Sequence, residues 1–119
     1  MNGLKSAEAL LAAYANGERY FTECELDGCS LKSTNLSGAT FLKSFMSSDF
    51  RGANLEGVHF EQCNLKTATF QNANLKDAVI TGCSVEGIDC KGATIENLNF
   101  NQNYYMGSIM QQSDLEGFC

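Results

Sequence analysis

The sequence has no proline, a single histidine and no long apolar run. A membrane-spanning helix needs about 20 consecutive apolar residues, whereas the hydrophobic 44% of this chain is scattered every two or three positions. The lone histidine, His59, argues against a catalytic triad, and no nucleophile has a base at a recognisable spacing. No glycine-rich loop for phosphate is present. The sequence therefore predicts a protein that is not an enzyme, has no cofactor and does not enter a membrane.

What the sequence does have is a five-residue period. A large apolar residue recurs at every fifth position, usually with a small residue two positions earlier, as Ala53 precedes Leu55 and Ala73 precedes Leu75. A helix would spread this pattern around its surface, and a strand would send alternate repeats to opposite faces. A chain that turns about a right angle after each repeat buries every small and large residue. Four repeats then close one square coil of a solenoid.

The period slips once, just after Met46. Repeats that include Met46 and repeats that start at Phe50 are out of phase by one residue, so the sequence predicts a one-residue deletion between them. Met46 rather than Phe45 is the expected inward residue, because Ser44 then takes the small position. The other choice would bury Lys43 without a partner, which is costly.

With this slip, large residues four repeats apart fall into four columns of like residues, stacked at the strand spacing of about 4.8 Å. Aromatic residues then stack on aromatic residues and leucines on leucines. The expected columns are Phe21, Phe41, Phe60, Ile80 and Phe100; Leu26, Met46, Leu65, Val85 and Tyr105; Leu31, Phe50, Phe70, Cys90 and Met110; and Leu36, Leu55, Leu75, Ile95 and Leu115.

The first residues follow a different pattern. Residues 6–16 carry alanine and leucine at helix-favouring density, and Asn16 and Gly17 supply a C-terminal stop. We therefore expect a capping helix and lead-in over residues 1–20 and one repeat domain over residues 21–119.

The repeats also resemble a known family. Residues 53–57 (ANLEG) and 73–77 (ANLKD) resemble the A-(D/N)-L-X-X unit of the pentapeptide-repeat proteins, and the likeness extends over residues 21–115. The resemblance implies an all-β solenoid, a right-handed quadrilateral β-helix of about five coils with a short N-terminal capping helix. It also implies a small bacterial protein.

Two functions are compatible with the resemblance. Most members of the family have no assigned activity, which favours a non-enzymatic interaction or scaffold module with an unknown protein partner. The alternative is a DNA-mimicking inhibitor or protector of DNA gyrase, because the best-understood relatives bind gyrase with an acidic rod and dimerise through their C-terminal ends. We expect no direct binding of nucleic acid.

Net charge of −6 is graded toward one side of the expected solenoid. One outward face is a candidate acidic interaction face, although Lys76 interrupts it. A solvated polar coat of mixed charge and a partner-binding stripe are both open interpretations. The acidic residues of this face are Glu56, Asp77, Glu96, Asp114 and Glu116.

Apolar residues gather again near the end of the sequence. The final coil of a solenoid leaves unpaired strand edges, and an apolar cluster beside such an edge is typical of an interface. We therefore expect a tail-to-tail homodimer; the alternative is that the last residues fold over the solenoid as its cap. The candidate interface residues are Tyr104, Met106, Ile109 and Phe118.

The cysteines fall mainly on inward positions. Cys24, Cys63 and Cys83 share one column of small positions, and Cys29 and Cys90 also lie on the repeat. We expect unpaired thiols that pack as compact apolar side chains, because parallel side chains in one column suit neither a disulfide nor a tetrahedral metal site. Reduced thiols and the weak signal-peptide pattern at the N-terminus predict a cytoplasmic location.

Overall fold

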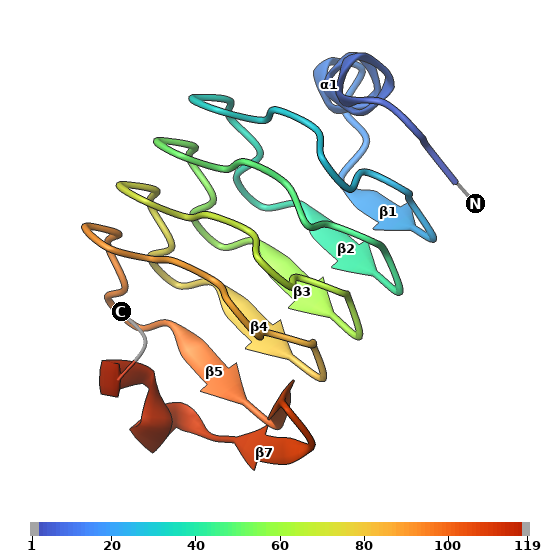
Figure 1. Ribbon diagram of the computed structural model, residues 1–119. Coiled ribbons are helices and arrows are strands. Elements are labelled where there is room, and N and C mark those ends of the chain that lie inside the picture. Colours follow the sequence, from blue (N-terminus) through green and yellow to red (C-terminus); the bar gives the residue numbers. More distant parts are fainter. Residues whose placement is uncertain (1–2, 118–119) are drawn as a thin grey trace.

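The computed structural model describes residues 3–117 as a four-faced β-solenoid of about four turns, with one short helix at its N-terminal end (Figure 1). The predicted quadrilateral β-helix is confirmed, but about four turns form rather than about five. The described molecule measures 37 × 25 × 21 Å along its principal axes.

Helix α1 (Ala7–Ala15) covers the first coil (Figure 1). It begins after Ser6, whose Oγ accepts the backbone N–H of Ala9 at 3.1 Å, which satisfies a donor that the helix leaves unpaired. Leu10 is completely buried, and the Tyr14 hydroxyl donates to the carbonyl of Ser37 at 2.7 Å. Burial and this hydrogen bond fix α1 against the solenoid, inside the segment where the sequence predicts a helix.

One face of the solenoid is a parallel sheet in which the strands follow chain order. Its central column is buried throughout, and the Phe41 ring stacks on those of Phe21 and Phe60 with centroids 5.4 Å apart in each pair. The strands are β1 (Tyr20–Thr22), β2 (Thr40–Leu42), β3 (His59–Glu61), β4 (Val79–Thr81) and β5 (Asn99–Asn101).

The predicted one-residue slip is present. Phe41 lies 20 residues after its strand partner Phe21, whereas Phe60 lies only 19 residues after its partner Phe41. Met46 is completely buried and the Phe45 side chain is 50% exposed, as the phase of the repeat predicts.

The slip is absorbed at one corner. At an ordinary corner a backbone N–H donates to the carbonyl three residues earlier, as Ala68 does to Leu65 at 3.0 Å. After Met46 the N–H of Ser48 donates to the carbonyl only two residues earlier, at 2.7 Å. Ser48 is buried in the small position of the next repeat, so the tighter turn restores the register.

The C-terminal end departs from the prediction. Strand β6 (Asn103–Tyr105) starts a fifth coil, but the chain then reverses into β7 (Ser108–Met110), which pairs with β6 antiparallel. The two residues between these strands, Met106 and Gly107, both have positive φ angles of 48° and 86°. This is the requirement of a two-residue hairpin turn whose twist matches that of the strands.

Three of the predicted columns therefore end early. Tyr105 is 37% exposed and Ile95 is 36% exposed, because no regular fifth coil covers them. Met110 is only partly buried, in a strand of the hairpin. Leu115 is buried, but it lies in the 3-10 helix η1 (Gln112–Gly117) and not in a fifth coil.

Candidate interaction surfaces

Asparagine side chains fix the backbone beside the predicted acidic residues. Asn54 and Asn74 are paired across neighbouring coils. The Oδ1 of Asn54 accepts the N–H of Glu56 at 3.1 Å, and that of Asn74 accepts the N–H of Lys76 at 3.0 Å. Such bonds to the residue two positions on stabilise a turn. Each coil therefore holds the residue after its large apolar side chain in the same outward position.

We use the term acidic face for Glu56, Asp77 and Glu96, which lie on one side of three successive coils. Glu56, Lys76 and Glu96 occupy equivalent positions, and Asp77 is the corner residue directly after Lys76. All three acidic residues are exposed. Asp77 sits at a corner with φ of 60°, a conformation that aspartate tolerates, and its Oδ1 accepts a hydrogen bond from Asn97 Nδ2 at 3.1 Å. Within residues 3–117 no ion pair joins Lys76 to a carboxylate of the acidic face. Direct contact with Lys76 therefore does not neutralise these carboxylates.

The other two predicted acidic residues are not on these coils. Asp114 is exposed on η1, where its Oδ2 accepts the N–H of Gln111 at 2.9 Å. Glu116 also belongs to η1, and its side chain lies outside what the structure describes. The structure thus brings together Glu56, Asp77 and Glu96, and places Asp114 in the C-terminal helix.

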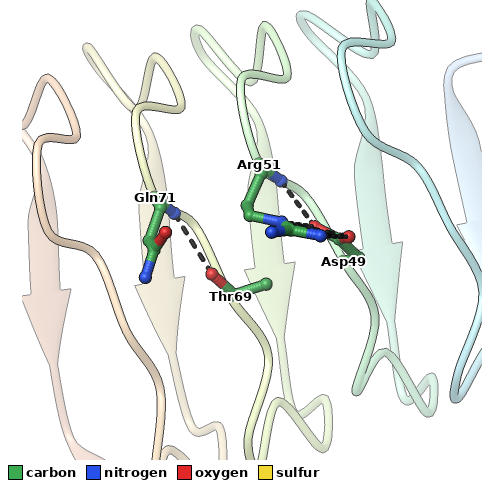
Figure 2. Close-up of polar contacts among 4 residues, drawn as sticks. All are labelled: Asp49, Arg51, Thr69 and Gln71. Atoms are coloured by element: carbon green, nitrogen blue, oxygen red, sulfur yellow. Dashed lines mark hydrogen bonds and ion pairs between the residues drawn. The ribbon is translucent and has the colours of Figure 1, made fainter.

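On the neighbouring face the carboxylates of Asp49 and Asp89 are hydrogen-bonded to side chains of the same face. Figure 2 shows Arg51 folded back onto Asp49, with Nη2 2.7 Å from Oδ2, and this hydrogen bond lowers the pKa of Asp49. One coil further on, Thr69 and Gln71 take the same places, and the N–H of Gln71 donates to Thr69 Oγ1 at 3.4 Å (Figure 2). A hydrogen bond from the Gln71 side chain at 2.6 Å lowers the pKa of Asp89. This face therefore has the character of a solvated coat.

Three of the four predicted interface residues are exposed on the β6–β7 hairpin. Tyr104, Met106 and Ile109 are 47%, 76% and 59% exposed, and Tyr104 and Ile109 are direct cross-strand partners. The N–H of Met106 donates to Glu86 Oε2 at 2.8 Å, and this bond lowers the pKa of Glu86. The fourth residue, Phe118, lies outside the described residues. We call Tyr104, Met106 and Ile109 the apolar tail.

Phe45 adds to this surface, although it was not among the predicted site residues. Phe45 belongs to an outward row in which parallel β-bridges join it through Asn64 and Ser84 to Tyr104. A hollow of about 310 Å³ lies between the two aromatic residues, and Gly82 is part of its lining. The choice of Met46 as the inward residue was the signal that Phe45 points outward.

The assumption of open strand edges at the end of the solenoid is wrong for two faces. The N–H of Phe100 in β5 donates to Gln112 Oε1 at 2.7 Å, and the N–H of Gln102 donates to Gln111 Oε1 at 3.4 Å. Strand β6 is covered by β7. Two glutamine side chains and a hairpin therefore cap these faces.

The cysteine column is a chain of hydrogen bonds and not only apolar packing. Ser44 Oγ accepts the N–H of Cys24 at 3.0 Å, Cys83 Sγ accepts the N–H of Cys63 at 3.4 Å, and Asn103 Oδ1 accepts the N–H of Cys83 at 2.9 Å. Each side chain thus satisfies a backbone donor of the preceding coil in the column. Burial raises the pKa of Cys24, which keeps this thiol protonated and unreactive.

The oxidation state of the cysteines differs from the prediction at one position. Cys24, Cys29, Cys63 and Cys83 are free thiols, whereas Cys90 is disulfide-bonded. The remaining cysteine of the sequence, Cys119, lies outside the described residues. The part of the chain from 3 to 117 contains no group of three His, Cys, Asp or Glu side chains that could hold a metal ion.

Stacked five-residue repeats that close a four-faced coil define the class as a β-solenoid. Family models agree with this class: a pentapeptide repeat region matches residues 53–118, and a model of nine pentapeptide repeats matches residues 21–69. The chain belongs to the pentapeptide-repeat family. No curated protein sequence matches it.

Solved structures share the fold. A pentapeptide repeat protein from Nostoc PCC 7120, alr5209, is 22% identical with a TM-score of 0.69, and the match covers 98% of this chain and 95% of that one. QnrB1, a plasmid-mediated fluoroquinolone resistance protein, is 22% identical with a TM-score of 0.69 over 71% of this chain. The match covers 45% of QnrB1, so the chain spans less than half of its length. A thylakoid lumen protein of Arabidopsis thaliana is 30% identical, with a TM-score of 0.57, over 59% of this chain and 50% of its own.

The described residues contain no helix with both the length and the hydropathy required to cross a bilayer.

Proposed function

We propose that this pentapeptide-repeat protein is a non-enzymatic, rigid interaction or scaffold module that binds a protein partner through its acidic face. The observation that carries the proposal is that Glu56, Asp77 and Glu96 are exposed on one side of three successive coils. These exposed carboxylates repeat on successive coils without a direct ion pair. Three carboxylates held on one rigid face outnumber the single Lys76 there, and their net negative potential attracts a basic partner.

Reversal of the charge of the acidic face is expected to abolish partner binding. The variant carries Glu56→Lys, Asp77→Lys and Glu96→Lys, and it should lose a partner that the parent protein captures reproducibly from its native lysate. The measurement is quantitative mass spectrometry of the captured proteins.

The matched control reverses three exposed carboxylates elsewhere, Glu8→Lys, Glu23→Lys and Glu25→Lys. It changes net charge by the same amount and should retain the partner. Equal loss in both variants would contradict a role for the acidic face, and no reproducible partner of the parent protein would leave the module without support.

A gyrase-directed DNA mimic is the second candidate function. The acidic face on a rigid rod supports it, as does the shared fold of QnrB1, which is described as a fluoroquinolone resistance protein. Lys76 interrupts the face, so the stripe is short. In a supercoiling assay with purified gyrase, a mimic should inhibit the enzyme or protect it from a quinolone at micromolar protein concentration. The absence of both effects would exclude this function.

The proposal includes a homodimer through the C-terminal end. The exposed apolar tail supports it, because Tyr104, Met106 and Ile109 lose contact with water in such an interface. Light scattering at micromolar concentration should give the mass of a dimer, and the double variant Met106→Ser and Ile109→Ser should give that of a monomer. A monomeric mass for the parent protein would remove the dimer.

We place the protein in the cytoplasm, where free thiols such as those of Cys24 and Cys63 persist. The disulfide at Cys90 is the observation against this location. The non-enzymatic character rests on the sequence, which has a single histidine, His59, and no nucleophile with a base at a recognisable spacing.

A further inference from the structure

The last complete coil ends in an edge of unused backbone groups. Within the stack, the N–H of Leu75 donates to the carbonyl of Thr94 at 2.8 Å, and the N–H of Asp77 donates to the next coil at 2.9 Å. The equivalent donors one coil later belong to Ile95 and Asn97. In residues 3–117 neither of these N–H groups has an acceptor. We call residues 91–97 the open edge.

The side chains of the open edge are also uncovered. Ile95 is 36% exposed, whereas Leu55 and Leu75 above it in the same column are 0% and 1% exposed. Ala93 is only partly buried, although Ala73 at the same position of the preceding coil is 1% exposed. The exposed surface is therefore the inward surface of a repeat that lacks its next coil.

The protein caps two other edges at its C-terminal end but not this one. Gln112 and Gln111 cap β5 and the residue after it, and β7 covers β6. Natural proteins usually block strand edges, since a free edge is a template for another chain. An edge that stays open where two other edges of the same end are capped is a candidate site for strand addition.

We propose that the open edge binds an extended segment of a partner polypeptide as an added strand. The stack itself specifies the segment. Thr94 donates its N–H to the carbonyl of Ala73 at 2.9 Å and accepts the N–H of Leu75. A partner residue that bonds in the same way to Ala93 and Ile95 continues the ladder.

The chemistry of the side chains follows from the column. The partner residue after the bridging one must be large and apolar to cover Ile95, and the residue before it must be small to lie over Ala93. The partner segment thus carries a small-x-large pattern, which is the pattern that each coil offers to the coil before it. This inference rests on the proposed function of an interaction module, but the open edge is a different surface from the acidic face.

The test uses a fluorescent synthetic peptide with the sequence of residues 51–60, RGANLEGVHF, as the probe. This segment carries the small-x-large pattern at Ala53 and Leu55. Fluorescence polarisation with the full-length protein should show saturable binding at micromolar concentration. The same peptide N-methylated at Asn54 lacks the donor to the carbonyl of Ala93, and it should bind at least about tenfold more weakly, the effect of one lost hydrogen bond.

The matched protein variants are Ile95→Pro and Ile95→Val. Proline removes an N–H that has no internal partner, so it is tolerated at an edge, and it should weaken peptide binding by about tenfold or more. Valine keeps both the donor and an apolar side chain and should bind as the parent protein does. Circular dichroism reports whether the proline variant is folded; if it is not, the N-methylated peptide still decides.

Three results would overturn the inference. The first is that the parent protein does not bind the peptide. The second is that the N-methylated peptide binds as tightly as the unmodified peptide. The third is that the protein is a dimer, that Ile95→Pro dissociates this dimer, and that the peptide does not bind. The last result would assign the open edge to a second copy of the chain. Any of them would leave the proposed function in place if charge reversal of the acidic face still abolished partner capture.

Discussion

The substitution Leu75→Lys is expected to unfold the solenoid at ordinary temperatures. Leu75 is 1% exposed and is stacked between Leu55 and Ile95 in one continuous column. A lysine there places a charge in the core without a partner, and the cost is several kcal/mol, on the order of the whole stability of a small domain. Because each coil is stabilised by its neighbours, we expect a lower melting temperature for the entire rod rather than a local change.

The measurement is thermal unfolding followed by circular dichroism, with Gln71→Lys as the control. Gln71 is only partly buried on an outward position one repeat earlier, so its substitution adds the same charge without burial and should shift the melting temperature little. A Leu75→Lys protein that melted like the parent would contradict the inward column.

The second large effect is expected for Asn103→Ala. Asn103 is completely buried, its Oδ1 accepts the N–H of Cys83 at 2.9 Å, and its Nδ2 donates to the carbonyl of Ile80 at 2.9 Å. Alanine leaves the buried N–H of Cys83 without its acceptor, removes the hydrogen bond to the carbonyl of Ile80 and creates a cavity. We expect a loss of about 2–4 kcal/mol in the free energy of unfolding.

Urea denaturation measures this loss, and Asn103→Ser is the matched variant. Ser44 performs a similar role in the same column, where its Oγ accepts the N–H of Cys24 at 3.0 Å and donates to the carbonyl of Leu42 at 3.1 Å. Serine at position 103 should therefore recover part of the loss. Equal stability of the serine and alanine variants would show that the amide hydrogen bonds contribute little.

The repeat predicts the core because inward packing requires one small and one large residue per repeat. The columns of the first four coils follow from this rule, and so does the deletion after Met46, since the other phase would bury Lys43. In the structure Lys43 is exposed and Ser44 is buried. Local spacing and the cost of burying charge were sufficient for this part of the fold.

The C-terminal end could not be predicted from the same rule. Tyr105 and Met110 keep the five-residue spacing, but both side chains point into the core only if the chain turns a corner between them. A Met-Gly pair with two positive φ angles reverses the chain instead, and methionine is not a typical residue of such a turn. The caps by Gln111 and Gln112 depend on long-range contacts to β5, which have no signature in the spacing of residues.

The candidate sites were predicted only as far as the coils extend. Glu56, Asp77 and Glu96 share a face because their positions relative to the core columns are fixed by the repeat. The five-residue repeat also predicted Asp114 on this face, but Asp114 follows the hairpin and belongs to η1. The hydrogen bonds of the cysteine column were missed, because the sequence shows that these positions are small and not that a coil leaves an unpaired N–H beside each one.

The tight corner at Ser48 has a consequence for recognition. The vertical distance between equivalent side chains is set by the strand spacing of about 4.8 Å and not by the number of residues in a coil. Thus Phe41 lies above Phe60 as Phe21 lies above Phe41, although 19 residues separate one pair and 20 the other. A partner that contacts one row on a face therefore meets the same spacing between side chains on both sides of the deletion. The single-residue deletion at this corner leaves the rows on the faces in register, and only the corner itself has one outward residue fewer.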